Sequence, residues 1–162
     1  MKDEFPGAVP EIPVSDVDQA AAYYKDHLGF TLHWGDDGGG IGGMWKGRCR
    51  LFLTNAAFRR SYGNSGPVVI WLNLGSKNEV DDLHETWSRS GARIVSPPES
   101  KPWKLHEFTA ADLDGNLLRV FYDFRGDTRV VLQHRRQRMC CSRSRRQVAL
   151  RLNGSVIFKY SS

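Results

Sequence analysis

The feature that most restricts the fold of this chain is a strand–helix–strand–strand–strand order that occurs twice. The two copies cover residues 8–56 and 67–124, and the end of the first strand, at residues 14–16, has its counterpart 60 residues later at 74–76. In such a βαβββ unit the helix covers only one face of the sheet, so two units can join their sheets around a shared cleft. The repeat therefore predicts an α+β fold of two βαβββ modules.

In the first copy, the signals for each element are local. Residues 8–14 read as a strand, and Pro10 and Pro13 place it at a sheet edge. Asp16, with Gln19 three residues later, predicts the start of a helix that ends at Gly29. Apolar segments then predict three strands, at residues 30–34, 41–45 and 50–54.

The second copy repeats these signals. A strand at residues 68–74 precedes Ser76 and Glu79, which form a capping box at the start of a helix that ends at Gly91. Three further strands are predicted, at residues 92–95, 105–111 and 117–121, with a tight turn at 112–116. The domain formed by both copies is expected to span residues 1–124.

Charge separates this domain from the rest of the chain. Residues 1–124 hold 13 lysines and arginines against 17 aspartates and glutamates, a net charge of −4, whereas residues 125–162 hold ten basic residues and one acidic residue, a net charge of +9. The chain is therefore expected to be an acidic domain with a basic C-terminal extension. Alternating apolar residues around Asn153 and Gly154 predict a β-hairpin within it, over residues 148–160.

The expected location follows from what the sequence lacks. Its apolar runs are far shorter than the ~20 residues that cross a membrane, and its first residues do not resemble a secretion signal. Its three cysteines are best explained as reduced thiols. We expect a soluble, cytoplasmic protein.

Three segments resemble a known family. The sequences IPVSD at residues 12–16 and AYYKDHLGF at 22–30 are similar to the opening module of the vicinal oxygen chelate superfamily, which contains glyoxalase I, bleomycin-resistance proteins and extradiol dioxygenases. The sequence FTAADLDGNLL at 108–118 is similar to its closing module. The resemblance covers residues 8–124 and implies the same paired-module fold.

The resemblance also implies where a metal would bind. Metal enzymes of this family carry His or Glu ligands at four strand positions, which here are occupied by Val9, Phe52, Val69 and Arg119. Valine and phenylalanine have no lone pair to donate, and a guanidinium is always protonated. The chain thus resembles the metal-free bleomycin-resistance branch, whose members are dimers that bind a drug without catalysis. No metal or cofactor is predicted.

Strand alternation then selects the residues expected to face a ligand. Residues two positions along a strand point the same way, so those sharing a face with the four former ligand positions are Glu11, Arg50, Thr54, Trp71, Asn73 and Phe121. Trp71 suits stacking on a planar ligand. Trp103 matches a cleft tryptophan of the bleomycin-resistance proteins, and Trp34 and Trp45 flank a glycine-rich segment, although core packing explains tryptophans equally well. The predicted ligand-binding residues are Glu11, Trp34, Trp45, Phe52, Trp71, Asn73, Trp103 and Arg119.

Several functions stay open at this point. The leading one is sequestration of a planar, cationic small molecule such as a bleomycin-class antibiotic by a homodimer with its cleft at the subunit interface. Acidic residues such as Glu107 would attract the cation. The alternative is a glyoxalase-like lyase or isomerase whose metal ligands are displaced to Glu11, His33 or Glu107. Nucleic-acid binding is expected only through the basic extension. The alternative for this extension is that it has no selected role.

Overall fold

The structure is a computed structural model that describes residues 7–63, 66–127, 151–152 and 155–156, in two units, Met1–Arg125 and Gly126–Ser162. In the second unit, β9 (Arg151–Leu152) pairs antiparallel with β10 (Ser155–Val156). These strands fall within the range for which the sequence predicts a hairpin. The rest of that range and the arginine-rich run at 135–146 lie outside the described residues.

The first module contains one helix and a four-stranded sheet. Its elements are β1 (Glu11–Pro13), α1 (Val17–Asp26), β2 (Thr31–Asp36), β3 (Ile41–Lys46) and β4 (Cys49–Thr54). The strands are arranged in the order β1-β4-β3-β2, with β1 parallel to β4 and the other pairs antiparallel. As the two prolines predict, β1 lies at an edge of the sheet.

The second module repeats the first. After the 3₁₀ helix η1 (Phe58–Ser61), its elements are β5 (Val69–Asn73), α2 (Lys77–Arg89), β6 (Arg93–Ser100), β7 (Leu105–Ala111) and β8 (Leu117–Asp123). The sheet order is β5-β8-β7-β6, and β5 is parallel to β8, so each strand has the same place as its counterpart in the first module. The predicted fold of two βαβββ modules is confirmed.

Strand β6 is longer than the sequence predicts. The expected strand ends at Val95, whereas β6 continues through Pro97 and Pro98 to Ser100. Proline cannot donate a ladder hydrogen bond, which is tolerated here because β6 is an edge strand and its pairing with β7 is irregular between Ser96 and Glu99.

Both helices begin where their capping residues predict. The Asp16 carboxylate accepts a hydrogen bond from the backbone N–H of Gln19 at 2.8 Å, and the Ser76 hydroxyl accepts one from the N–H of Glu79 at 3.2 Å. Each bond satisfies an N–H group that has no partner within its helix. The caps thereby fix where the helices start relative to the strands that precede them.

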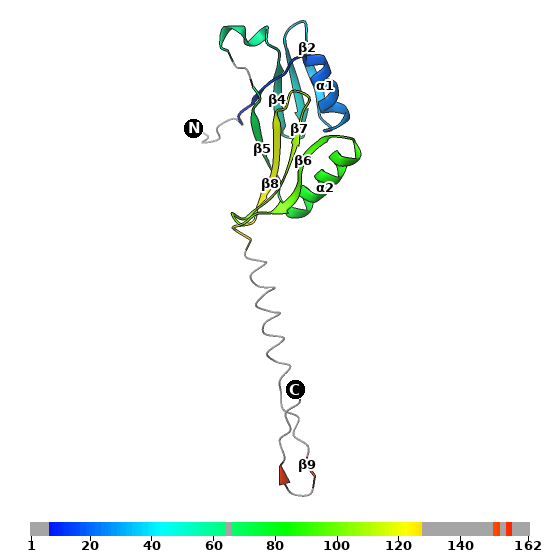
Figure 1. Cartoon of the computed structure of the whole chain (residues 1–162), viewed down its shortest axis with the longest axis vertical. Coiled ribbons are helices and arrows are strands. Elements are labelled where there is room, and N and C mark those ends of the chain that lie inside the picture. The colour runs from blue at the N-terminus through cyan, green and yellow to red at the C-terminus, as the bar shows by residue number, and fades with distance from the viewer. Residues whose placement is uncertain (1–6, 64–65, 128–150, 153–154, 157–162) are drawn as a thin grey trace, which may run out of the picture. The chain divides into compact units, whose positions relative to one another are not determined.

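One hydrophobic core joins the two modules. Both helices lie on the same side of the strands (Figure 1), and buried residues from both modules form a single cluster. Trp87 of α2 is buried within it, packs edge-to-face on Phe108 of β7, and donates from Nε1 to the carbonyl of Leu28 at 3.0 Å. The modules therefore pack through α1 and α2, and within the described residues the opposite face of each sheet carries no α-helix.

The turn between β7 and β8 makes a second, polar link between the modules. The Asn116 side chain donates from Nδ2 to the Pro13 carbonyl and to the Asp112 carboxylate, both at 2.8 Å, and Tyr24 of α1 donates to Asp112 at 3.1 Å. Asp112 and Asn116 are both buried. Burial raises the pKa of the Asp112 carboxyl above its ordinary value, and the hydrogen bonds that it accepts oppose this effect.

This raised pKa predicts a pH dependence of stability. The native state then keeps the Asp112 proton to higher pH than the unfolded chain, so the stabilising contribution of this group is complete below the ordinary pKa of 3.8 and is lost as the pH rises through the raised value. We expect the free energy of unfolding of the natural protein, relative to that of Asp112→Asn, to fall as the pH increases. Urea denaturation of both proteins, at pH values from below 3.8 upward, measures the difference. An increase with pH would mean that the hydrogen bonds outweigh burial.

Candidate functional site

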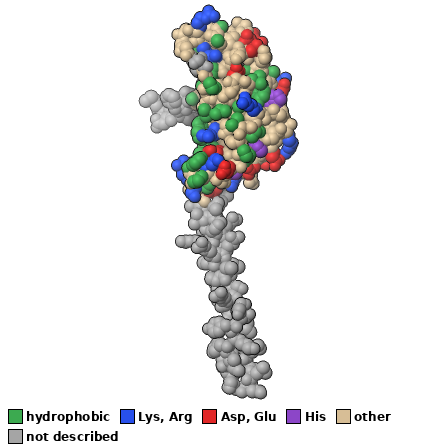
Figure 2. All heavy atoms as spheres, viewed as in Figure 1, with side chains coloured by type: hydrophobic (Ala, Val, Ile, Leu, Met, Phe, Trp, Pro, Cys, Tyr) green, Lys and Arg blue, Asp and Glu red, His purple; other side chains and the backbone are tan. Residues whose placement is uncertain are grey.

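The candidate site is the face of the two sheets that is turned away from the helices, called here the open face. Register places Glu11 opposite Phe52 on the first sheet and Trp71 opposite Arg119 on the second. Their neighbours along each strand, such as Leu53 and Leu118, are buried in the core. Figure 2 shows hydrophobic side chains gathered over the middle of the first unit, interspersed with basic ones.

On the second sheet, an aromatic pair and an arginine form a cluster. The rings of Trp71 and Phe121 meet edge-to-face with centroids 5.5 Å apart, and the guanidinium of Arg119 lies over the Trp71 ring at 4.7 Å. Asn73 is paired with Phe121 at the end of β5. Trp71 is 50% exposed and Val69 beside it is 51% exposed, so this cluster is open to solvent. It combines a stacking surface with a fixed positive charge.

On the first sheet, Trp34 and Phe52 form the corresponding aromatic pair. Their ring centroids are 5.3 Å apart, and Trp34 is 42% exposed. The Trp34 ring lies over Gly43, where an added Cβ would come within 2.5 Å of Nε1. A residue larger than glycine at position 43 would therefore displace Trp34 from Phe52.

Glu11 lies on the open face, and its carboxylate already accepts hydrogen bonds from neighbouring side chains. Its Oε1 accepts hydrogen bonds from the hydroxyls of Thr54 at 2.9 Å and Tyr62 at 2.7 Å. The buried Arg59 of η1 in turn donates to the Thr54 hydroxyl at 3.1 Å. The η1 segment therefore lies at the Glu11 end of the open face. Glu11 is hydrogen-bonded there to Thr54 and Tyr62 and also lies beside Phe52.

The two other predicted tryptophans have different surroundings from Trp34 and Trp71, although register places Trp45 on the same face as Phe52. Trp45 of β3 is packed between the His33 ring, at a centroid distance of 3.7 Å, and the Arg50 guanidinium, at 5.1 Å. Trp103 lies in the turn between β6 and β7 and is 56% exposed. The Trp45 ring is therefore in contact with side chains of its own sheet, whereas Trp103 lies in a turn.

Two residues outside the predicted set lie on the open face. Phe121 completes the cluster with Trp71, and Glu107 of β7 is paired with Phe121 across the strands. Strand alternation from Arg119 identifies Phe121 in the sequence. The burial of Glu107 has no signal in the sequence because it depends on neighbours from other strands.

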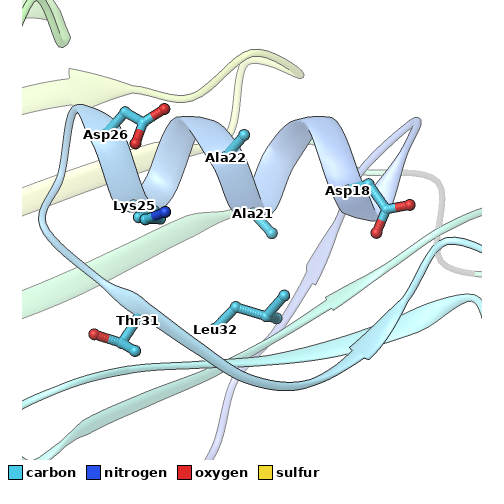
Figure 3. A pocket seen from close by; sticks show the side chains of 7 residues that line it. All are labelled: Asp18, Ala21, Ala22, Lys25, Asp26, Thr31 and Leu32. Atoms are coloured by element: carbon cyan, nitrogen blue, oxygen red, sulfur yellow. The ribbon is translucent and has the colours of Figure 1, made fainter.

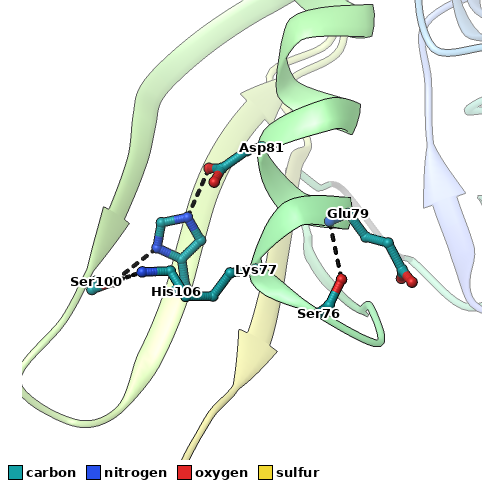
Figure 4. Close-up of polar contacts among 6 residues, drawn as sticks. All are labelled: Ser76, Lys77, Glu79, Asp81, Ser100 and His106. Carbon is teal, nitrogen blue, oxygen red and sulfur yellow. Dashed lines mark hydrogen bonds and ion pairs between the residues drawn. The ribbon is translucent and has the colours of Figure 1, made fainter. Parts of the chain in front are cut away.

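The neighbour of Glu107 points the other way. His106 faces α2, where its Nε2 lies 2.8 Å from Asp81 and its Nδ1 lies 2.9 Å from the Ser100 hydroxyl (Figure 4). Lys77 donates to the same hydroxyl at 2.9 Å, and an ammonium can only donate, so the Ser100 proton is available to His106 Nδ1. The network attaches α2 to β6 and β7.

Two surface hollows lie on the helix side of the unit. One, of about 430 Å³, lies between α1 and β2 and is lined by Asp18, Ala21, Ala22, Lys25, Asp26, Thr31 and Leu32 (Figure 3). The other, of about 220 Å³, is lined by residues at the start of α1 and by Leu113 and Asp114. None of the eight predicted ligand contacts lines either hollow.

Metal donors are not gathered within the described part of the chain. Over residues 7–63 and 66–127, no three His, Cys, Asp or Glu side chains are grouped so that they could hold a metal ion. The displaced donors considered above, Glu11, His33 and Glu107, accordingly do not form such a group. Of the helices described, none is long and apolar enough to span a membrane.

The fold of two βαβββ modules is that of a known class of proteins. Residues 8–120 match the Glyoxalase/Bleomycin resistance protein/Dioxygenase superfamily. The chain belongs to this superfamily, whose name covers enzymes as well as resistance proteins.

Individual relatives agree with this assignment. The chain is 27% identical over 124 residues to a bleomycin resistance protein of Geobacillus stearothermophilus. This alignment covers 70% of this chain and 94% of the relative. A glyoxalase/bleomycin resistance protein/dioxygenase from Nocardioides has a similar structure, with a TM-score of 0.62, 22% identity and coverage of 76% of this chain and 87% of its own. The bleomycin-binding protein of Streptomyces verticillus, solved with copper(II)-bleomycin, has a TM-score of 0.56, 25% identity and coverage of 72% and 95%.

Proposed function

We propose that this protein binds and sequesters a planar, cationic small molecule of the bleomycin class and catalyses no reaction. The observation that carries the proposal is the exposed cluster of Trp71, Phe121 and Arg119, with the Trp34 and Phe52 pair on the other sheet. Aromatic faces bind planar ligands by stacking, which contributes on the order of 1 kcal/mol beyond area burial. The bleomycin resistance and bleomycin-binding relatives support the ligand class.

The proposal includes metal independence. Two of the four positions at which the family's metal enzymes carry ligands, Phe52 and Arg119, belong to these clusters, and Val69 lies beside Trp71. Apolar and cationic side chains at these positions favour contact with the planar part of an organic ligand over coordination of a metal ion.

The proposal also includes a homodimer. A single chain exposes large apolar side chains on the open face, among them Trp34, Val69 and Trp71. Contiguous exposed apolar surface marks sites of ligand or protein contact. A second copy that faces the first would enclose the ligand between the two open faces, and sedimentation equilibrium would detect it as twice the mass of the chain.

Calorimetric titration of metal-depleted protein with metal-free bleomycin and with copper(II)-bleomycin tests the function. We expect saturation at one drug molecule per chain and protection of DNA from bleomycin cleavage at equimolar protein. Addition of Zn²⁺, Ni²⁺ or Mn²⁺ to the protein should leave the affinity unchanged. Failure to bind either form of the drug would refute the ligand, and binding that requires added metal would refute metal independence.

A further inference from the structure

Glu107 is the residue of the open face with the most unusual environment. Register places it opposite Phe121 of β8 and opposite Glu99 of β6, so all three share one face of the second sheet. The alternate residues of β7, His106 and Phe108, face α2 and the core. The Glu107 carboxylate is therefore directed to the same side as the Trp71 cluster.

This carboxylate is buried and incompletely partnered. Glu107 is only 5% exposed, and its Oε2 accepts no hydrogen bond from any of the residues that the structure describes. It takes part in none of the ion pairs found among them. A buried charge without a partner is costly, so such a group is normally found where a ligand or an ion supplies the partner.

Within the described part of the chain, the nearby charged groups do not supply that partner. The guanidinium of Arg119 is stacked on Trp71 of β5, whereas Glu107 lies on β7, on the other side of β8. Lys101 forms its ion pair with Glu99, the exposed carboxylate opposite Glu107. Of the two carboxylates on these paired positions, only Glu99 has a cationic partner among the described residues, so the Glu107 carboxylate beside the aromatic surface favours a positively charged group of a ligand.

We propose that Glu107 is the cation-binding anchor of this site. Its carboxylate accepts a charge-assisted hydrogen bond from a protonated amine or amidinium of the ligand, while the planar part of the same ligand lies against Phe121 and Trp71. This inference rests on the proposed function, because it assigns the charged part of the ligand to one residue. It specifies the ligand class as an aromatic cation.

Two small probes test the anchor independently of bleomycin. Proflavine is a planar aromatic cation near neutral pH, and acridine is its uncharged parent at mildly alkaline pH. We expect Glu107→Gln, which keeps the shape and removes the charge, to weaken proflavine binding by about tenfold or more and acridine binding by less than about twofold. Fluorescence titration of the full chain at one ionic strength measures both affinities.

A matched variant separates the anchor from general acidity. Glu99→Gln removes an exposed carboxylate on the same face, and we expect it to change proflavine binding by less than about twofold because that charge is screened and already paired. Thermal unfolding checks that both variants fold, and Glu107→Gln should be at least as stable as the natural protein because it removes a buried charge that forms no ion pair with any described residue.

The outcomes distinguish this inference from the proposed function. Equal losses for proflavine and acridine, equal losses in both variants, or no proflavine binding by the natural protein would each overturn the anchor. Bleomycin binding that survives in Glu107→Gln at full affinity would overturn it while leaving the sequestration function in place. A tenfold loss confined to proflavine and Glu107→Gln would support it, even if the natural protein did not bind bleomycin.

Discussion

Replacement of Trp87 by alanine will lower the free energy of unfolding of the domain by about 3–5 kcal/mol. Trp87 is buried where the two modules meet, and its ring packs on Phe108 while its Nε1 donates to the Leu28 carbonyl. The substitution leaves a cavity and removes the hydrogen bond donated to the Leu28 carbonyl. Urea denaturation of the full chain, followed by circular dichroism, measures the change.

Two further variants show whether the loss comes from this location. Trp87→Phe keeps most of the ring volume and should recover more than half of the lost stability. Leu113→Ala removes an apolar side chain that is exposed in the β7–β8 turn, and we expect a change within about 0.5 kcal/mol. A Trp87→Ala effect as small as that of Leu113→Ala would contradict the shared core between the modules.

Replacement of Trp71 by alanine will weaken bleomycin binding by about tenfold or more, which corresponds to ~1.4 kcal/mol. The substitution removes a half-exposed aromatic surface and the ring on which the Arg119 guanidinium is stacked. Because Trp71 is not part of the core, the free energy of unfolding should change much less than in Trp87→Ala. Isothermal titration calorimetry is the suitable measurement, since the variant lacks one of the fluorescent side chains.

Trp71→Phe provides the matched comparison for this prediction. It retains a stacking surface and an edge for Phe121, so we expect an affinity between those of the natural protein and Trp71→Ala. Leu113→Ala, which lies outside the open face, should bind as the natural protein does. Full affinity in Trp71→Ala would show that the ligand does not contact the open face of the second sheet.

Much of the fold could be predicted because its signals are local. Asp16 and Ser76 cap the helices as expected, and the 60-residue repeat corresponds to two sheets with the same strand order. Strand alternation also places Trp71, Asn73 and Arg119 on one face. The caps and the alternation depend on residues only a few positions apart, and the repeat is recognised because the same local signals recur 60 residues later, so the sequence contains the necessary information.

Strand β2 shows where alternation fails. Leu32 and Trp34 are two residues apart and would share a face in a regular strand, but the pairing of β2 with β3 shifts between them. As a result, Trp34 packs on Phe52 on the open face, while Leu32 lies on the side of Val17 of α1. A bulge of this kind is set by the partner strand and is not visible in the sequence of β2.

The sequence by itself determined the module order, the helix starts and the residues that line each face of the regular strands. Only the tertiary structure decided how each side chain on those faces is used: Glu11 is hydrogen-bonded to Thr54, Trp45 is packed against His33, and Glu107 is buried with one oxygen that has no partner among the described residues. The physical reason is the distance along the chain over which each effect acts. Periodicity and capping act over a few residues, whereas burial and hydrogen bonding of a side chain depend on neighbours from other strands that only folding brings together.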